Sequence, residues 1–413
     1  MKSQKILNDP VYGFITIPSE LIFTIIDHPY FQRLRRIKQL GLTDFVYPGA
    51  LHTRFHHAIG AMHLMSITLD NLRIKGTEIS DQEYEAALIA ILLHDIGHGP
   101  FSHALEYSLL RGVPHEELSL LTIELLNEQL GGQLDLALRI FKNQYDRKFL
   151  NQLVSSQLDI DRLDYLQRDC FFTGVSEGTI GADRIIKMMA VKDEQLVIEE
   201  KGIYSIENFL SARRLMYWQV YLHKTTVSAE KMLINLIQRS KHLAQSGMEF
   251  TVSEELGFFM NQDFTLTDFK ANREILEKFH SLDDFDIWGA IKLWKNHPDY
   301  VLANISRMFL MRNLFKINLS SETFGEEEIL EQREKTKKKL NLPEEDIDFF
   351  FSSGKVSNYG YLAKDKINIL TKKGKVIDVA QAADLPNIKV MSKIVEKHYI
   401  CKAKNLILTY NPS

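Results

Sequence analysis

The stretch LLHDIGHGPFSH at residues 92–103 constrains this chain more than any other. Eight small or apolar residues, Ala86 to Leu93, lead directly into His94 and Asp95. An imidazole and a carboxylate at the end of a buried helix are costly to desolvate without a partner, and a divalent metal ion suits both groups. We therefore predict a buried helix that ends in one half of a metal site.

The histidines are concentrated in the first third of the chain. Eight of the 14 fall between His52 and His115. Histidine is the commonest metal-ligating side chain and the one that exchanges protons most readily near pH 7. This clustering indicates a site rather than a scatter of core and surface residues.

The overall composition narrows the class of protein. The chain has 413 residues, of which 45% are hydrophobic and 25% charged, with a net charge of −4. This charge argues against nucleic acid as the main partner. Two distant cysteines cannot build a disulfide framework, and no run reaches the roughly 20 apolar residues of a membrane span. We expect a cytoplasmic protein without a membrane partner.

Hydrophobic periodicity predicts a mainly helical fold with a small C-terminal α+β unit. We expect one large unit over residues 1–320 and the α+β unit over residues 321–413. A strand is expected at 14–17 and a hairpin at 191–204. Helices are expected at 19–26, 29–41, 55–74, 81–95, 115–141, 150–169, 183–189, 205–243 and 287–315, and a strongly charged helix or linker at 326–346.

Two further residues would complete a metal site. His57 begins a predicted helix, and on its own it is more often a structural histidine than a ligand. Asp161 lies at the start of another helix, where it offers a carboxylate oxygen. With His94 and Asp95 these residues give two nitrogen and two oxygen ligands, which suit Fe, Mn, Zn, Ni or Mg and leave positions open for water and substrate.

The ligands in this order resemble those of the HD-domain phosphohydrolases. Five longer strings resemble, in order and near spacing, the deoxynucleoside triphosphate (dNTP) triphosphohydrolases, in particular the branch that includes the SAM-and-HD-domain protein. The resemblance covers roughly residues 5–320, and its strings are FQRLRRIKQLG, YPGALHTRFHHAIG, LLHDIGHGPFSH, PHEELS and LDIDRLDYLQRDC.

The resemblance implies an HD-domain helical fold and a metal-dependent reaction. It makes residues 1–320 the catalytic core, with an N-terminal regulatory segment. Members of this family, which includes dGTPases, hydrolyse the bond between the 5′-oxygen and the α-phosphorus, releasing a deoxynucleoside and triphosphate. Matching positions for proton transfer and phosphate contact are His98, His103, His115 and Glu116. Which histidine is the general acid stays open.

Substrate contacts follow partly from periodicity. Asp161, Tyr165 and Asp169 recur every four residues, so a predicted ligand, an aromatic ring and a carboxylate share one helical face. Tyr165 is expected to pack on the sugar and Asp169 to accept from its 3′-hydroxyl. By resemblance the further contacts are Gln39, Leu40, Arg54, Arg213, Tyr217 and Tyr221.

The same resemblance implies regulation by a GTP or dNTP activator, with an additional Mg²⁺ ion, at sites between subunits of a homotetramer. A first site matches Lys5, Asn8, Asp27, Gln32 and Arg35. A second site matches Arg184, His223, Lys224, Arg312 and Lys316. The i, i+4 spacing of Arg312 and Lys316 predicts that both lie on one helical face, where an anion between them would relieve their repulsion.

Two other functions stay open at this point. An HD phosphohydrolase of nucleoside monophosphates or other phosphate esters would share the metal ligands but would not need Tyr165 and Asp169. A nucleotide-sensing regulatory protein would keep the positions from Lys5 to Arg35 and lose His98 or His115.

Overall fold

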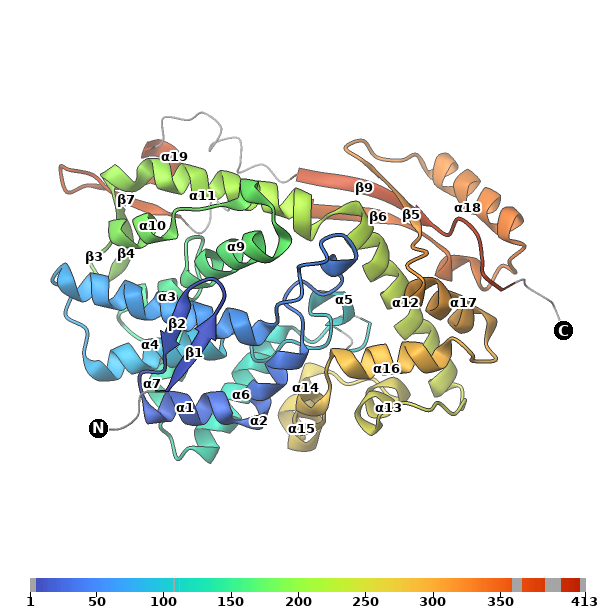
Figure 1. The fold of residues 1–413 in the computed structure, drawn as a ribbon, viewed down its shortest axis with the longest axis horizontal. Helices are drawn as coiled ribbons and strands as arrows, with labels where there is room; N and C mark the ends of the chain where they lie inside the picture. The colour runs from blue at the N-terminus through green and yellow to red at the C-terminus, as the bar shows by residue number, and fades with distance from the viewer. Residues whose placement is uncertain (1–4, 107, 111, 359–365, 383–394, 409–413) are drawn as a thin grey trace.

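The computed structural model describes residues 5–106, 108–110, 112–358, 366–382 and 395–408. It is an elongated molecule with one hydrophobic cluster in each half (Figure 1). The first lobe is built mainly from the chain up to about residue 221, and the second lobe mainly from later residues. The predicted mainly helical fold with a small C-terminal α+β unit is confirmed.

Three helices of the first lobe pack together and carry the predicted metal ligands: α3 (Arg54–Ile74), α4 (Asp81–Leu93) and α9 (Ile160–Thr173). The start of α4 is set by a capping box, in which Ser80 and Glu83 each satisfy a backbone amide of the other. Asp159 accepts from the amide of Arg162 and so begins α9. Both α3 and α4 lie close to the predicted bounds.

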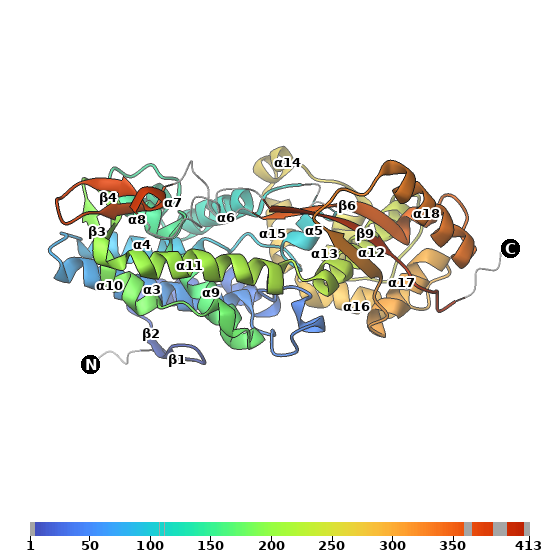
Figure 2. The same ribbon diagram turned by 90° about the horizontal axis from the view of Figure 1, so that it is seen from above.

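The other elements of the first lobe surround these three helices (Figure 2). They are β1 (Ile6–Asp9), β2 (Gly13–Thr16), α1 (Glu20–Asp27), α2 (Pro29–Gln32), α7 (Asp135–Phe141), α8 (Lys148–Val154), α10 (Ala182–Met188) and α11 (Ile203–Met216). The helix α6 (His115–Gln129) contributes side chains to both hydrophobic clusters.

The second lobe is organised around α12 (Lys224–Gln245), which contacts α5, α13 and α17. Its other helices are α5 (His103–Glu106), α13 (Glu254–Asn261), α14 (Leu266–Ala271), α15 (Arg273–Ser281), α16 (Asp284–Trp294), α17 (Tyr300–Leu310) and α18 (Glu326–Leu340).

Several helices that the periodicity predicts as continuous are interrupted. Gly131 and Gly132 adopt positive φ and separate α6 from α7. Between α11 and α12, Tyr217–Tyr221 forms one π-helical turn. Pro298 lies between α16 and α17, where its ring prevents a continuous helix. The predicted helix 29–41 is only α2 followed by a 3-10 turn at Arg33–Arg36, and the predicted helix 150–169 is divided into α8 and α9.

Two small sheets tie the C-terminal residues to the rest of the chain. One has the order β3-β4-β7-β8, from β3 (Met189–Lys192), β4 (Gln195–Glu199), β7 (Asn368–Leu370) and β8 (Val376–Asp378), with α19 (Val379–Ala382) following. The other has the order β5-β9-β6, from β5 (Lys316–Ser320), β6 (Phe351–Asn358) and β9 (Val395–Lys402). The hairpin predicted at 191–204 is β3–β4. The strand β5 ends at residue 320, the predicted domain boundary, and is hydrogen-bonded to β9 from the other side of that boundary.

The prediction that Arg312 and Lys316 share a helical face is wrong. The helix α17 ends at Leu310, Arg312 has a φ of 55°, and Lys316 begins the strand β5. The helix has ended before Arg312, so the i, i+4 geometry of a helix does not apply to this pair.

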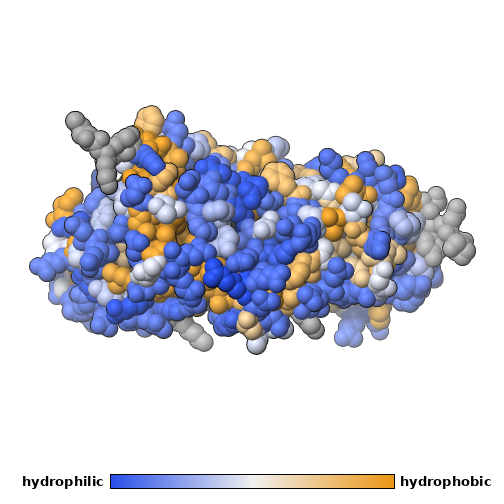
Figure 3. Space-filling model, turned by 90° about the horizontal axis from the view of Figure 1, so that it is seen from below, coloured by the Kyte–Doolittle hydropathy of each residue, from blue (hydrophilic) through white to orange (hydrophobic). Residues whose placement is uncertain are grey.

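Among the described residues, no helix is both long enough and apolar enough to cross a membrane. The face shown in Figure 3 is mainly hydrophilic, with hydrophobic residues interspersed.

Candidate metal centre and adjoining cavity

The three helices of the first lobe bring three predicted ligands to one point. His57 lies in the first turn of α3, His94 caps the end of α4, and Asp161 lies in the first turn of α9. The Nε2 atoms of the two histidines are 3.4 Å apart, and Asp161 Oδ1 is 3.1 Å from His57 Nε2 and 3.4 Å from His94 Nε2. Neighbouring ligands at about 2.1 Å from an ion lie about 3 Å apart, so these atoms are spaced to share one ion.

Asp95 lies at the edge of this group. Its Oδ1 is 3.4 Å from His94 Nε2 and its Oδ2 is 3.8 Å from His57 Nε2. Arg54 donates to Oδ2, and Ser102 Oγ accepts from the same guanidinium at 2.8 Å. The arginine thus holds the carboxylate on which a fourth coordination bond depends. We refer to His57, His94, Asp95 and Asp161 as the metal cluster.

The remaining ring nitrogens of the two histidines are already bonded. His57 Nδ1 is 2.7 Å from Asp164 Oδ2, and His94 Nδ1 is 2.6 Å from the carbonyl oxygen of Ile91. Each acceptor fixes the proton on Nδ1, which leaves the lone pair of Nε2 directed at the cluster. This arrangement of donors fits a divalent cation.

Charge pairing dominates the protonation of the metal cluster. Burial lowers the pKa of His57, but hydrogen bonds to Asp161 and Asp164 outweigh it and raise that pKa to about 10. Burial opposes ionisation of Asp161, yet its hydrogen bonds with His57 and His94 hold its pKa well below the ordinary range. In the metal-free protein Asp161 is therefore ionised, and His57 carries a proton on both ring nitrogens.

A cavity of about 440 Å³ opens beside the metal cluster. Asp161 lies in its wall, together with seven of the eight predicted substrate residues: Gln39, Leu40, Arg54, Tyr165, Asp169, Tyr217 and Tyr221. The wall also includes Arg162 and Glu230, which the sequence reasoning did not single out.

Asp169 is held rigidly in the cavity wall. Its Oδ1 is 2.8 Å from His52 Nε2, and its Oδ2 accepts from the hydroxyl of Tyr221 at 2.7 Å. Arg213, the eighth predicted substrate residue, is buried and donates to the carbonyl and the side-chain oxygen of Gln157.

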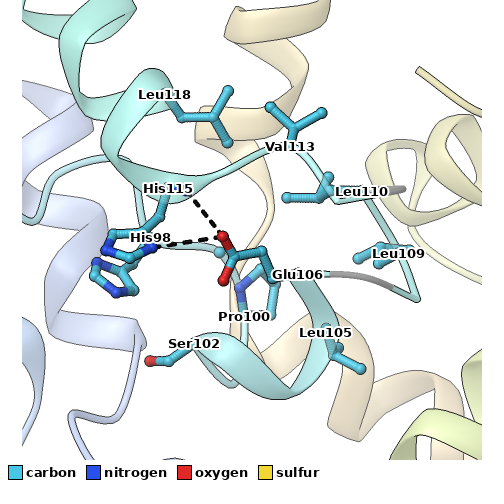
Figure 4. A pocket seen from close by; sticks show the side chains of 11 residues that line it. His98, Pro100, Ser102, Leu105, Glu106, Leu109, Leu110, Val113, His115 and Leu118 are labelled. Atoms are coloured by element: carbon cyan, nitrogen blue, oxygen red, sulfur yellow. Dashed lines mark hydrogen bonds and ion pairs between the residues drawn. The ribbon is translucent and has the colours of Figure 1, made fainter. Parts of the chain in front are cut away.

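A second histidine pair, His98 and His115, adjoins Asp95 of the metal cluster. Figure 4 shows this pair beside Glu106. The rings of His98 and His115 have centroids 3.8 Å apart, and His98 Nδ1 is 3.4 Å from Asp95 Oδ1. Glu106 Oε1 accepts from the amide of His115 at 3.1 Å and lies 3.6 Å from its Nδ1. Glu116 Oε2 is 3.4 Å from the same Nδ1. These groups form a chain of proton-exchanging atoms that reaches a cluster ligand.

His103 begins α5, but its side chain lies outside the described part of the structure.

The residues predicted for the first regulatory site lie along the N-terminal segment. Lys5 precedes β1 and its ammonium lies over the ring of Phe23, Asn8 lies within β1, and Asp27 ends α1. Gln32 Oε1 accepts from Arg35 at 2.8 Å. One stretch of nine residues thus holds Asp27, Gln32 and Arg35, and it runs from the end of α1 through α2 into the 3-10 turn Arg33–Arg36.

The residues predicted for the second regulatory site lie on several elements. His223 caps α12 and Lys224 is its first residue. Arg312 donates to the carbonyl of Phe45 at 2.8 Å, and Arg184 on α10 donates to Ser205 Oγ at 3.2 Å. Lys316 lies in a separate groove against α18.

Sequence reasoning missed the residues that support the ligands rather than bind the ion. Asp164 is one example, although its spacing to Arg168 is the i, i+4 spacing of a helical ion pair and could have indicated it. Glu106 and Glu230 left no such signal, because their places follow from the packing of α5 and α12.

Comparisons with known proteins agree with this geometry. Residues 54–169 match the family model of the HD domain, and residues 180–252 match that of the HD associated region. The chain is similar to the crystal structure of a phosphohydrolase from Bacteroides thetaiotaomicron, with a TM-score of 0.93 and 52% identity, covering 97% of this chain and 100% of that chain.

Two curated relatives differ in how much of them the chain covers. It is 37% identical to the uncharacterized protein YwfO of Bacillus subtilis, over 76% of this chain and 72% of that protein. It is 34% identical to the deoxynucleoside triphosphate triphosphohydrolase SAMHD1 homolog of Dictyostelium discoideum, over 56% of this chain and 48% of that protein. The chain thus matches about half the length of this second relative. The segment of this chain that matches the HD domain contains all four residues of the metal cluster. This match and the similarity to the relatives show that the chain belongs to the HD-domain phosphohydrolase family.

Proposed function

We propose that this protein hydrolyses dNTPs to a deoxynucleoside and inorganic triphosphate. The observation that carries the proposal is the single cavity that joins Asp161 of the metal cluster to Tyr165 and Asp169. Its volume of about 440 Å³ lies in the range of small-molecule sites. The relatives named as dNTP triphosphohydrolases support this choice of substrate.

The metal cluster and two arginines would receive the phosphates. Bound there, a divalent ion would polarise the phosphoryl oxygens and lower the pKa of a water molecule. Arg162 lies next to Asp161 in the cavity wall, and Arg54 reaches the same wall from α3. Two guanidinium groups suit the several negative charges of a triphosphate.

His98, His115 and Glu106 would move the proton that the leaving 5′-oxygen requires. The two closely spaced rings and the nearby carboxylate allow a proton to be held or passed on without bulk water. Glu116 lies close enough to His115 to share in this role.

Tyr165 and Asp169 would hold the sugar. Asp169 already accepts from Tyr221 and lies against His52, so its carboxylate is fixed before a 3′-hydroxyl arrives. A ring at Tyr165 packed against the 2′-carbon would leave no room for a 2′-hydroxyl.

We propose further that nucleotides activate the enzyme as a homotetramer. Arg35 provides a physical connection to the metal cluster, because its guanidinium lies over the ring of Phe55, 3.5 Å from the centroid. Phe55 directly follows Arg54 and lies two residues before His57 in the first turn of α3. An anion that draws Arg35 away from this ring would act on the turn that carries a ligand.

A product-resolved assay tests the proposal. The protein is incubated with each dNTP and with Mn²⁺, Fe²⁺ or Mg²⁺, with and without GTP, and the products are separated by chromatography. We expect deoxynucleoside and triphosphate in equal amounts. Asp161→Ala should abolish metal binding and turnover, whereas Asp146→Asn, at an exposed position, should not. Release of orthophosphate or pyrophosphate would show that a different bond is cut.

A further inference from the structure

Glu230 is an acidic side chain in the cavity wall for which the proposed reaction has no use. It lies on α12 in the second lobe and is half-buried. Within the described part of the chain its carboxyl group makes no hydrogen bond and no ion pair. A carboxyl group in such a position favours a ligand that supplies donors.

Helix α12 sets the position of Glu230 in the cavity wall. The helix α12 packs against the 3-10 turn Thr43–Phe45 and against α5, and Thr43 and Ala104 from these elements join Glu230 in the cavity wall. Burial raises the pKa of Glu230 to about 7, and Lys231 is the one ionisable group that acts against this rise.

A second hydrogen-bond acceptor in the cavity wall also has no donor. Gln39 lines the cavity, and its Oε1 is buried without a hydrogen-bond partner among the described residues. Leu40, Gly41 and Leu222 provide apolar surface beside these groups. A flat ring that carries N–H donors along one edge would suit this combination of apolar walls and acceptors.

We propose that Glu230 reads the base of the nucleotide and selects a base with two adjacent N–H donors, which among the four DNA bases is guanine. This inference rests on the proposed dNTP substrate, whose phosphates at the metal cluster would direct the base toward Glu230. Guanine offers its N1–H and N2–H₂ groups side by side to a carboxylate. Adenine and cytosine place one amino group next to an acceptor, and thymine places its one N–H between two carbonyl oxygens, which a carboxylate repels.

Glu230→Gln tests this inference, since it keeps the size of the side chain and turns one acceptor into a donor. The ratio of kcat/KM for dGTP to that for dATP is measured at pH 8.5, where the carboxyl group is ionised, for the wild type and the variant. Binding of the four dNTPs to chelator-treated protein is measured in parallel by calorimetry. Glu328→Gln on the exposed part of α18 is the matched control.

We expect the wild type to prefer dGTP and Glu230→Gln to reduce the dGTP-to-dATP ratio by about five- to 150-fold, the range of one lost bidentate contact. An unchanged ratio, or an equal loss for all four dNTPs, would overturn the role of Glu230 in base recognition. Selective binding without triphosphate release would overturn the proposed function and leave the inference standing. Absence of dNTP binding together with absence of dNTP turnover in the presence of metal would overturn both.

Discussion

The substitution Asp164→Asn tests how the metal cluster is supported. Asp164 is fully buried, lies 2.7 Å from His57 Nδ1 and accepts from Arg168 at 2.9 Å. Arg168 in turn donates to Asp9 at 2.7 Å. An asparagine of the same shape would remove the charge that orients the histidine and balances the arginine.

Two magnitudes follow from these contacts. Loss of an outer partner of a ligating histidine weakens metal binding about 10- to 100-fold, or about 1.4 to 2.7 kcal/mol. Burial opposes ionisation of Asp164, but Arg168 and His57 lower its pKa from 3.8 to about 2, which corresponds to about 2 kcal/mol of folding free energy. Breaking a buried ion pair costs about 3 kcal/mol or more, which is of the same size.

The sign of the pH dependence is fixed by the lowered pKa. The native protein binds fewer protons at Asp164 than the unfolded chain, so this contribution is present above about pH 4 and is lost as the pH falls toward 2. The stability difference between the wild type and Asp164→Asn should therefore be largest near neutral pH.

The measurements separate the two effects. Urea unfolding of chelator-treated protein at a series of pH values gives the stability difference, and calorimetry with Mn²⁺ at pH 7 gives the affinity. Asp146→Asn, on the exposed surface, is the matched control. Metal affinity equal to that of the wild type would refute the argument that Asp164 orients His57.

Four further predictions follow from the same contacts. Because His57 has a pKa of about 10 and must be neutral to bind metal, metal binding at pH 7 should release at least one proton; calorimetric heats that are equal in buffers of different ionisation enthalpy would contradict this. Tyr221→Phe should lower kcat/KM for dNTPs about tenfold or more, because Asp169 loses a charge-assisted hydrogen bond; unchanged kinetics would remove that bond from substrate positioning. Gly60→Ala should destabilise the protein by several kcal/mol, since its Cβ would collide with Arg168 and Asp164. Gly289→Ala has open space around its Cβ and should stabilise α16 by about 0.5–1 kcal/mol. Urea unfolding of the two variants shows whether their stabilities follow this order. The double variant Asp27→Ala, Arg35→Ala should lose nucleotide activation in the product assay, and full activation would place the regulatory site elsewhere.

The first turn of α3 contains residues that take part in metal binding and in the proposed regulation. Arg54 holds Asp95, Phe55 lies beneath Arg35, and His57 is a cluster ligand, all within four residues. A short helical turn moves as a unit, so a nucleotide can act on catalysis here only if it binds one position of this turn more tightly than another.

The proximity of the cluster residues could be anticipated from the sequence because these residues lie at helix ends. An apolar run that ends in His94 and Asp95, and a carboxylate at the start of a helix, are local patterns that can be read without tertiary structure. The same holds for Tyr165 and Asp169, whose spacing of four residues places them on one face of α9.

Other regular spacings gave a wrong prediction where the backbone was not helical. Arg312 and Lys316 have helical spacing, but Arg312 lies in a turn with positive φ after α17 and Lys316 begins β5. Glu230 shows the opposite case, because it lies in a helix with no distinguishing neighbours and gains its position from α12 packing against the turn Thr43–Phe45, nearly 190 residues earlier in the chain. The residues that define the proposed chemistry are thus local in sequence, whereas the residue proposed to read the base depends on contacts between segments far apart in the chain, which local periodicity does not encode.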